Sequence, residues 1–256
     1  MKYYSWMAVS ALLLGFTMLD LTSCSKDEEN GGAAPTEKEN GGKDDDKPVA
    51  TSEVVVTVDD NGQADGGHHF QKIDETKFII DGVQYSMEND HLVVFEYDKT
   101  NSMDAVVIIS TLKYQGSTMD VTRIKKLAFK GCAGITSCVI GNKVTSIGEE
   151  AFDGCTSLSS VTIPSSVTNI DKKAFEHCRG LSSVTIPSSV TSIGRGTFHD
   201  CSGLRHVYCH AVNPPSAEDL FGETPISSAT LHVPAESLDA YKATSPWSGF
   251  GTIVAL

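Results

Sequence analysis

The nonapeptide SSVTIPSSV occupies Ser159–Val167 and recurs, letter for letter, at Ser182–Val190. Around these copies the chain aligns without gaps in lines of 23 residues. The lines are Thr136–Leu158 (TSCVIGNKVTSIGEEAFDGCTSL), Ser159–Leu181 (SSVTIPSSVTNIDKKAFEHCRGL), Ser182–Leu204 (SSVTIPSSVTSIGRGTFHDCSGL) and a preceding partial line, Val121–Ile135 (VTRIKKLAFKGCAGI). A repeat of this length indicates stacked structural units, because each unit must offer the next one a matching surface.

Four apolar columns run through the aligned lines. They contain Ile124, Ile147, Ile170 and Ile193; Phe129, Phe152, Phe175 and Phe198; Cys132, Cys155, Cys178 and Cys201; and Ile135, Leu158, Leu181 and Leu204. Within a line, Val161-Thr162-Ile163 alternates apolar and polar residues, which predicts a strand with one buried face. Pro164 then ends the strand because it cannot donate to the ladder.

A period of 23 residues lies in the range of leucine-rich repeats. We therefore predict a mainly β fold with short helical turns: a solenoid of about four coils over residues 121–204, with coils about 4.8 Å apart. A solenoid exposes core and unpaired strand edges at its ends, so different terminal units must cover them. We predict an N-terminal β cap over residues 53–120 and a C-terminal cap over residues 205–256.

Both predicted caps have local sequence signals. Phe78–Tyr85 predicts a β-hairpin, because Asp81-Gly82 suits a tight two-residue turn. The downstream segment contains three aromatic residues that we expect to cover the last coil rather than to form a ligand cage. They are Tyr241, Trp247 and Phe250.

The repeat resembles the BspA-like leucine-rich repeats of bacterial surface proteins, whose unit runs L-x-x-V-x-I-P-x-x-V-x-x-I-G-x-x-A-F-x-x-C. One line matches this unit at Leu158, Val161, Ile163, Pro164, Val167, Ile170, Ala174, Phe175 and Cys178. Asp171 departs from the pattern, because it stands where the unit has glycine. The resemblance covers Val121–Leu204 and implies a surface lipoprotein that attaches to matrix proteins.

The first 24 residues predict an export signal. Lys2 is followed by an apolar run at Trp6–Leu19, which is too short for a membrane-spanning helix of about 20 residues and suits a secretory signal peptide. Leu21-Thr22-Ser23-Cys24 resembles a bacterial lipobox, which makes Cys24 the predicted site of lipid attachment. A conventional secretory signal with an incidental cysteine is the alternative.

Residues 25–52 predict a flexible acidic tether. Ser25–Glu29 resembles the export signal that carries lipoproteins to the outer surface of Gram-negative bacteria. The following Gly, Pro, Lys, Glu and Asp residues bury too little apolar surface to offset the entropy of ordering. We therefore predict an outer-membrane, lipid-anchored and surface-exposed protein that contacts the membrane through the lipids on Cys24.

Composition and spacing exclude several functions. The net charge of −13 argues against a nucleic-acid partner, which would require a basic face. Zinc sites need clustered ligands such as C-x-x-C, which the sequence does not contain, and nothing in the sequence completes a coordination set around His177 and His199. The serines follow strand alternation rather than a pattern that supplies a base and an orienting group. We predict no catalytic residues, no metal, no cofactor and no enzymatic activity.

The six cysteines after Cys24 leave two interpretations open. An even number in an exported protein suggests disulfides. However, each cysteine occupies a position where the repeat demands a small buried apolar residue, a role that cysteine fills well. Adjacent coils bring parallel side chains close, but this arrangement gives an awkward disulfide dihedral. We favour free thiols.

The outward positions of the predicted strands form a flat, nearly uncharged strip rich in hydroxyl groups. The candidate binding residues are Ser137, Ser160, Thr162, Ser183, Thr185, His206 and Tyr208. Hydroxyls both donate and accept hydrogen bonds, which suits polar recognition of proteins or glycans. The alternative interpretation is that they only keep the sheet soluble.

We therefore predict a non-catalytic, adhesin-like surface protein that displays its repeats to a protein of the host matrix, of a host cell or of another bacterium. The attachment role is partly an analogy with the repeat family. The alternative is a glycan-capture accessory lipoprotein of an outer-membrane uptake system. That function requires exposed aromatic platforms, and Tyr208 is the obvious candidate on the strip.

Overall fold

The computed structural model describes residues 53–101 and 103–256. The predicted signal peptide, the lipid-attachment residue Cys24 and the tether lie outside these residues and stay predictions. The chain divides into two units, Met1–Lys43 and Asp44–Leu256, and the described residues belong to the second. No helix in the described part of the chain has the length and apolar character needed to cross a bilayer.

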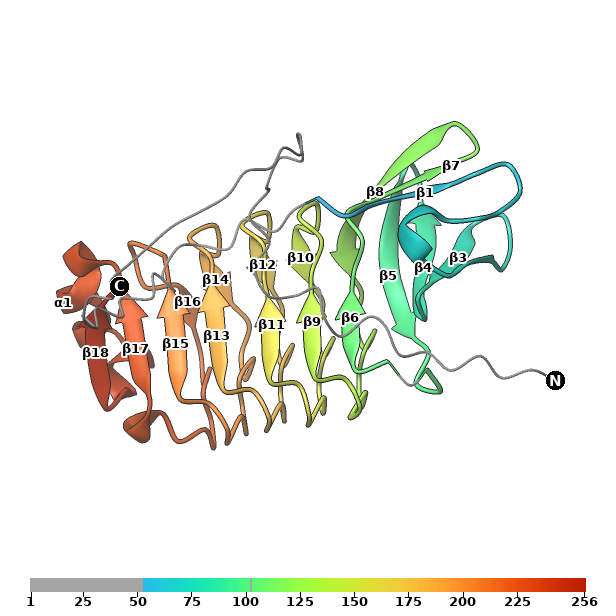
Figure 1. The fold of residues 1–256 in the computed structure, drawn as a ribbon. Coiled ribbons are helices and arrows are strands. Elements are labelled where there is room, and N and C mark those ends of the chain that lie inside the picture. Colours follow the sequence, from blue (N-terminus) through green and yellow to red (C-terminus); the bar gives the residue numbers. More distant parts are fainter. Residues whose placement is uncertain (1–52, 102) are drawn as a thin grey trace, which may run out of the picture. The chain divides into compact units, whose positions relative to one another are not determined.

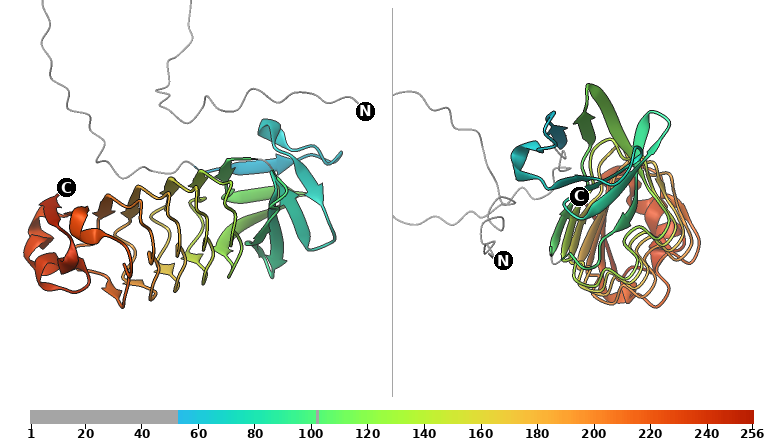
Figure 2. Two further views of the ribbon diagram at one scale, coloured as in Figure 1. Left: turned by 90° about the horizontal axis from the view of Figure 1, so that it is seen from below. Right: turned by 90° about the vertical axis from the view of Figure 1, so that its right-hand side faces the viewer.

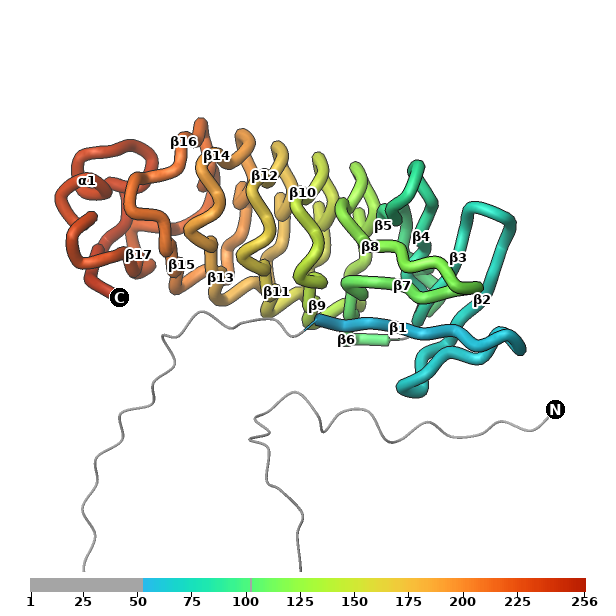
Figure 3. Tube along the Cα trace, turned by 90° about the horizontal axis from the view of Figure 1, so that it is seen from above, coloured from blue at the N-terminus to red at the C-terminus, as the bar shows by residue number. Residues whose placement is uncertain are grey.

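Two series of short parallel strands build the repeats (Figure 1). The first series is β6 (Ala105–Val107), β9 (Ser137–Val139), β11 (Ser160–Thr162), β13 (Ser183–Ile186), β15 (His206–Cys209), β17 (Thr230–Val233) and β18 (Thr252–Ala255). The second series is β8 (Ser117–Ile124), β10 (Ser146–Ile147), β12 (Asn169–Ile170), β14 (Ser192–Ile193) and β16 (Ser216–Ala217). Seen from above, the two series run side by side along the stack (Figure 3).

The strand register follows the 23-residue period. Ile147 lies opposite Ile124 and Ile170, and Ile170 lies opposite Ile193. In the first series, Ser160 lies opposite Ser137. Successive coils therefore superimpose when viewed along the stack (Figure 2). The predicted mainly β solenoid is confirmed.

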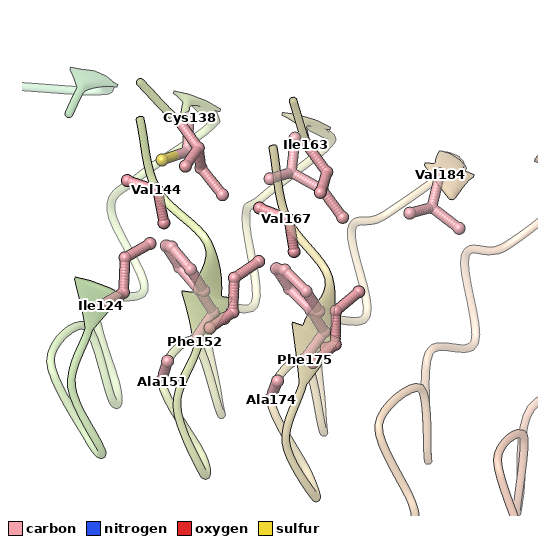
Figure 4. Close-up of a cluster of buried hydrophobic side chains, with 14 of the residues drawn as sticks. Ile124, Cys138, Val144, Ala151, Phe152, Ile163, Val167, Ala174, Phe175 and Val184 are labelled. Atoms are coloured by element: carbon pink, nitrogen blue, oxygen red, sulfur yellow. The ribbon is translucent and has the colours of Figure 1, made fainter. Parts of the chain in front are cut away.

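The four phenylalanines of the repeat form one row of stacked, fully buried rings. The ring centroids of Phe129 and Phe152 are 4.8 Å apart, those of Phe152 and Phe175 5.1 Å, and those of Phe175 and Phe198 5.7 Å. Phe221 continues this phenylalanine row at 5.8 Å from Phe198. Figure 4 shows Phe152 and Phe175 in the core among aliphatic side chains of neighbouring coils.

The cysteine column lies beside the phenylalanine row. The thiols of Cys155, Cys178 and Cys201 each lie 3.2 Å from the backbone oxygen of a phenylalanine in the preceding coil and donate to it. All six cysteines of the described residues are buried free thiols, as the sequence analysis favoured. Cys155, Cys178 and Cys201 therefore connect coils by hydrogen bonds rather than by covalent bonds.

We expect the six thiols to be protected from alkylation in the folded protein at about pH 7 and to react after unfolding, because only the thiolate is nucleophilic. Burial raises the pKa of Cys138 and of Cys201 to about 12, and that of Cys132 to about 11. Mass spectrometry of native and urea-unfolded samples treated with iodoacetamide, without reductant, measures this difference. Cysteines that stay unlabelled after unfolding would reveal disulfides and contradict the assignment.

The N-terminal part is an antiparallel meander joined to the second strand series. It contains β2 (Phe70–Lys72), β3 (Lys77–Ile80), β4 (Val83–Glu88) and β5 (His91–Tyr97), and β5 pairs with β8 in parallel. The predicted hairpin at Phe78–Tyr85 is confirmed: Asp81 and Gly82 have φ angles of 49° and 80°, which the left-handed turn requires.

A second pair of strands completes this end. β1 (Val55–Val58) pairs in parallel with β7 (Thr111–Tyr114), and β7 forms an antiparallel hairpin with β8. No local sequence signal indicates this partner of β1, because the two segments lie more than 50 residues apart in sequence. A 3-10 turn, η1 (Asp65–Gly67), follows β1.

The C-terminal part contains a short helix and three 3-10 turns: α1 (Leu238–Ala243), η2 (Ile226–Ser228), η3 (Ala235–Ser237) and η4 (Trp247–Gly249). Tyr241, Trp247 and Phe250 are buried against the last coils, as expected from the sequence. The indole of Trp247 donates to the backbone oxygen of Pro215 at 3.0 Å. Parallel pairing continues through β15, β17 and β18, beyond residue 204. The predicted domain boundaries stay predictions.

Candidate functional site

The outward positions of the first strand series form one continuous surface, which we call the strand face. From β6 to β17 its residues alternate with buried ones along each strand. They are Ala105, Val107, Ser137, Val139, Ser160, Thr162, Ser183, Thr185, His206, Tyr208, Thr230, His232, Thr252 and Val254. Within the described strands, none of these positions carries Asp, Glu, Lys or Arg.

The structure places all seven predicted binding residues on this face. Ser137 lies on β9, Ser160 and Thr162 on β11, Ser183 and Thr185 on β13, and His206 and Tyr208 on β15. Ser160 and His206 are exposed and the other five are half-buried. Whether they bind a ligand stays a prediction. Their common orientation follows from strand alternation and from the parallel register.

The sequence analysis missed residues at both ends of the strand face. At the N-terminal end, Ala105 and Val107 on β6 lie opposite Ser137 and Val139. At the C-terminal end, His232 on β17 lies opposite Tyr208. The alternating pattern of Thr230–Val233 was the available signal, but the break at Pro214-Pro215 obscures its register with the preceding lines.

The C-terminal end of the strand face carries an aromatic cluster, formed by His206, Tyr208 and His232. The Tyr208 and His232 rings stack at a centroid distance of 4.3 Å. Nδ1 of His206 lies 3.2 Å from Nε2 of His232, within hydrogen-bond distance. One face of the Tyr208 ring is therefore covered by His232.

The strand face is built on two hydrogen-bonded sheets. A three-stranded sheet contains β6, β9 and β11, and a four-stranded sheet contains β13, β15, β17 and β18. β11 and β13 are neighbours in the stack, and the amide of Ser182 still donates to the oxygen of Ser159 at 3.4 Å just before β13 begins. The aromatic cluster lies on the four-stranded sheet, which also carries hydroxyl-bearing residues of the strand face on β13, β17 and β18.

Several charged residues of the repeats lie in the turns, where they pair between coils. Glu149 lies 3.1 Å from both Lys126 and Lys172, and hydrogen bonds from these two lysines hold the pKa of Glu149 below its usual value. Arg179 binds Asp200 and lowers the pKa of that carboxyl in the same way. Exposed pairs of this kind contribute little stability each. These ion pairs lie in the turns and not on the uncharged strand face.

One group of turn residues has ligand atoms close enough to hold a metal ion. A carboxylate oxygen of Glu176 and a ring nitrogen from each of His177 and His199 lie within 4.8 Å of one another. From the sequence, nothing completed a coordination set around the two histidines. The repeat period was the missed signal, because Glu176 and His199 are 23 residues apart and so occupy the same position in adjacent coils.

Parallel coils, a buried phenylalanine row and a repeat of 23 residues define a leucine-rich-repeat solenoid. Residues 122–242 match the family model described as "BspA type Leucine rich repeat region", in six copies. This part of the chain is thus a BspA-type leucine-rich-repeat region, and the resemblance stated from the sequence is confirmed. No curated protein matches the chain.

Solved structures of bacterial leucine-rich-repeat proteins resemble this one. A leucine-rich repeat protein of T. pallidum superimposes with a TM-score of 0.54 at 21% identity, over 68% of this chain and 80% of that chain. The pneumococcal vaccine antigen PcpA gives a TM-score of 0.54 at 16% identity, over 73% of this chain and 49% of that chain. A leucine-rich repeat protein of Bacteroides capillosus gives 0.49 at 26% identity, over 53% and 99% of the two chains. The first two likenesses show a shared fold.

Proposed function

We propose that this protein is a non-catalytic, adhesin-like surface protein that presents its strand face to a protein partner. The partner would be a protein of the host matrix, of a host cell or of a neighbouring bacterium. Leucine-rich-repeat proteins generally bind proteins, which supports this class of function. We further propose that lipids on Cys24 attach the chain to the outer membrane with the repeats exposed outside the cell.

The observation that carries the proposal is the absence of charged side chains from the described strand face of a chain with a net charge of −13. The centres of protein interfaces are depleted of charged residues and enriched in tyrosine, because buried charges are costly to desolvate. A sheet that needed only solubility would gain it more readily from lysine or glutamate. The hydroxyl groups add hydrogen-bonding capacity without this desolvation cost.

Glycan capture has less support from the geometry. A sugar ring stacks on an open aromatic face, and one face of Tyr208 is already covered by His232. The two coils that precede Tyr208 offer no second aromatic platform, because their strand-face positions carry Ser160, Thr162, Ser183 and Thr185. A glycan array separates the two functions, because strong binding that disappears in Tyr208→Ala would favour the glycan-binding alternative.

The strand face is tested by adding charge to it. Ser160→Arg places a cation at an exposed position of β11, and we expect it to reduce binding to a responsive matrix or cell-surface protein at least about tenfold, because the charge must be desolvated. Ser192→Arg is the matched control, since Ser192 is an exposed serine on β14, in the other strand series. Binding is measured by surface plasmon resonance with the soluble chain from Ser25. Equal losses in both variants, or no loss in either, would contradict the proposal.

The anchoring part of the proposal has its own test. Cys24→Ala should abolish incorporation of labelled fatty acid and release the protein from the membrane fraction, because two or more acyl chains are needed for stable attachment. Protease treatment of intact cells should remove the repeats from the wild-type protein. Full protection from the protease would contradict exposure outside the cell, without bearing on the strand face.

A further inference from the structure

The turn after the second strand of each coil places one residue of every coil in a common row. The row follows the phenylalanine row directly in sequence and contains Lys130, Asp153, Glu176, His199 and Gly222. The residue after each of these has a left-handed backbone, with φ between 52° and 73°, in Gly131, Gly154, His177, Asp200 and Glu223. The first two coils therefore use glycine there, whereas the third presents the side chain of His177.

Backbone hydrogen bonds hold neighbouring members of this row in register. The amide of Gly154 donates to the oxygen of Glu176 at 2.9 Å, and the amide of His177 donates to the oxygen of His199 at 2.9 Å. The two turns are thus fixed at about one strand spacing from each other. Side chains at positions 176, 177 and 199 therefore project from a rigid ridge.

Glu176, His177 and His199 form what we call the His–Glu cluster. One ligand atom from each residue lies within 4.8 Å of the others. Two imidazole nitrogens and one carboxylate oxygen are a donor set typical of Zn²⁺ sites that keep one position for water. The described part of the chain thus contains a three-ligand set that crosses from one coil to the next.

Asp153 positions His177. Nδ1 of His177 lies 2.8 Å from Oδ1 of Asp153, whose side chain is almost fully buried. A carboxylate that accepts from one imidazole nitrogen fixes the ring and makes the other nitrogen the better metal ligand. The geometry therefore assigns Nε2 of His177 to the metal.

His199 has a buried nitrogen that nothing else satisfies. Its Nδ1 is inaccessible to solvent and has no hydrogen-bond partner among the described residues. The nearest acceptor is Oε1 of Glu176 at 3.7 Å, which is longer than a hydrogen bond. The ring rests on Gly222, where an added Cβ would lie 2.6 Å from Cδ2 of His199. A buried polar atom without a partner is costly, and a metal ion would satisfy it.

The remaining charges leave the cluster available. Lys173 lies 3.1 Å from Oε2 of Glu176, so Oε1 is the oxygen that faces His199. Arg179 occupies the carboxylate of Asp200, which is next to His199 in sequence. Neither cation lies between the two histidines and Oε1 in the contacts of the described residues.

We propose that Glu176, His177 and His199 bind one divalent transition-metal ion, preferentially Zn²⁺, with water as the fourth ligand. The ion connects two adjacent coils in the charged turns, away from the strand face. It supplies a cross-link that the free cysteines do not. The proposal is independent of the proposed binding function.

The test uses the purified full chain after treatment with a chelator, titrated with ZnCl₂ by calorimetry. We expect one high-affinity site, which Glu176→Gln, His177→Ala and His199→Ala each weaken at least about tenfold. Asp153→Asn should weaken it about 10–100-fold while leaving all three ligands in place. Glu176→Gln keeps the size of the side chain, so its thermal unfolding without metal should match that of the wild type.

A double variant, His206→Ala with His232→Ala, is the control, because these two histidines form another close pair with 3.2 Å between ring nitrogens. It should keep the high-affinity site. Co²⁺ alone should give the visible absorption of a site with nitrogen and oxygen ligands, without a thiolate charge-transfer band. Unchanged Zn²⁺ affinity in the cluster variants, loss of the site in the control, or a thiolate band would overturn the proposal.

Discussion

Phe175→Ala is expected to lower the free energy of unfolding by about 3–5 kcal/mol, the range for deleting a buried aromatic ring. The ring is fully buried and stacks between Phe152 and Phe198. The amide of Phe175 donates to the oxygen of Thr197 at 3.0 Å, so the neighbouring coils cannot close over the cavity without losing backbone bonds. The loss should therefore fall in the upper part of this range.

Urea unfolding followed by circular dichroism measures this difference. Thr162→Ala is the matched control, because Thr162 lies on the strand face and its change should cost less than about 0.5 kcal/mol. Similar losses in the two variants would show that the assignment of inward and outward residues is wrong.

Trp247→Ala is expected to cost about 3–5 kcal/mol as well, but mainly at the C-terminal end. The fully buried indole contacts the rings of Phe221 and Tyr241, with centroids 5.7 Å and 5.5 Å away. The substitution removes these contacts and also the hydrogen bond from the indole to Pro215. In a solenoid each unit contacts only its neighbours, so the damage should stay close to the cap.

Hydrogen exchange with mass spectrometry distinguishes this local effect from global unfolding. Peptides from β17, β18 and α1 should exchange faster in Trp247→Ala, whereas those from β9 and β11 should be unchanged. Ser248→Ala, an exposed neighbour, is the control and should alter neither group. Equal acceleration in all coils would contradict the idea that Trp247 acts as a local cap.

The repeat made much of the fold predictable. A gap-free period places Ile124, Ile147 and Ile170 opposite one another by translation alone, because every coil repeats the same backbone path. The outward direction of Ser160 and Thr162 follows from alternation for the same reason. The repeat spacing was sufficient to predict these features, because each is set by contacts within one coil or with the adjacent coil.

Features that depend on distant or degenerate sequence were less predictable. The pairing of β1 with β7 joins segments with no shared repeat letters, so no local pattern specifies it. Phe221 continues the phenylalanine row 23 residues after Phe198, but its line has Cys209 in place of the strand's isoleucine and is interrupted by Pro214-Pro215. The His–Glu cluster required two lines to be compared at neighbouring positions, since no single turn contains all three ligands.

The cysteine column has a consequence for the protein's susceptibility to oxidation. At the position of the next coil stands Thr224, whose hydroxyl donates to the oxygen of Phe198 at 2.6 Å and accepts from the amide of Cys201 at 3.0 Å. The hydroxyl thus donates to a phenylalanine backbone oxygen of the preceding coil, as the thiols do. This position of the repeat therefore requires a small hydrogen-bond donor rather than sulphur itself. Alcohols are not oxidised to sulfenic, sulfinic or sulfonic acids as thiols are. The fold therefore tolerates threonine in place of cysteine in an individual coil, and that coil then has no oxidisable thiol at this position.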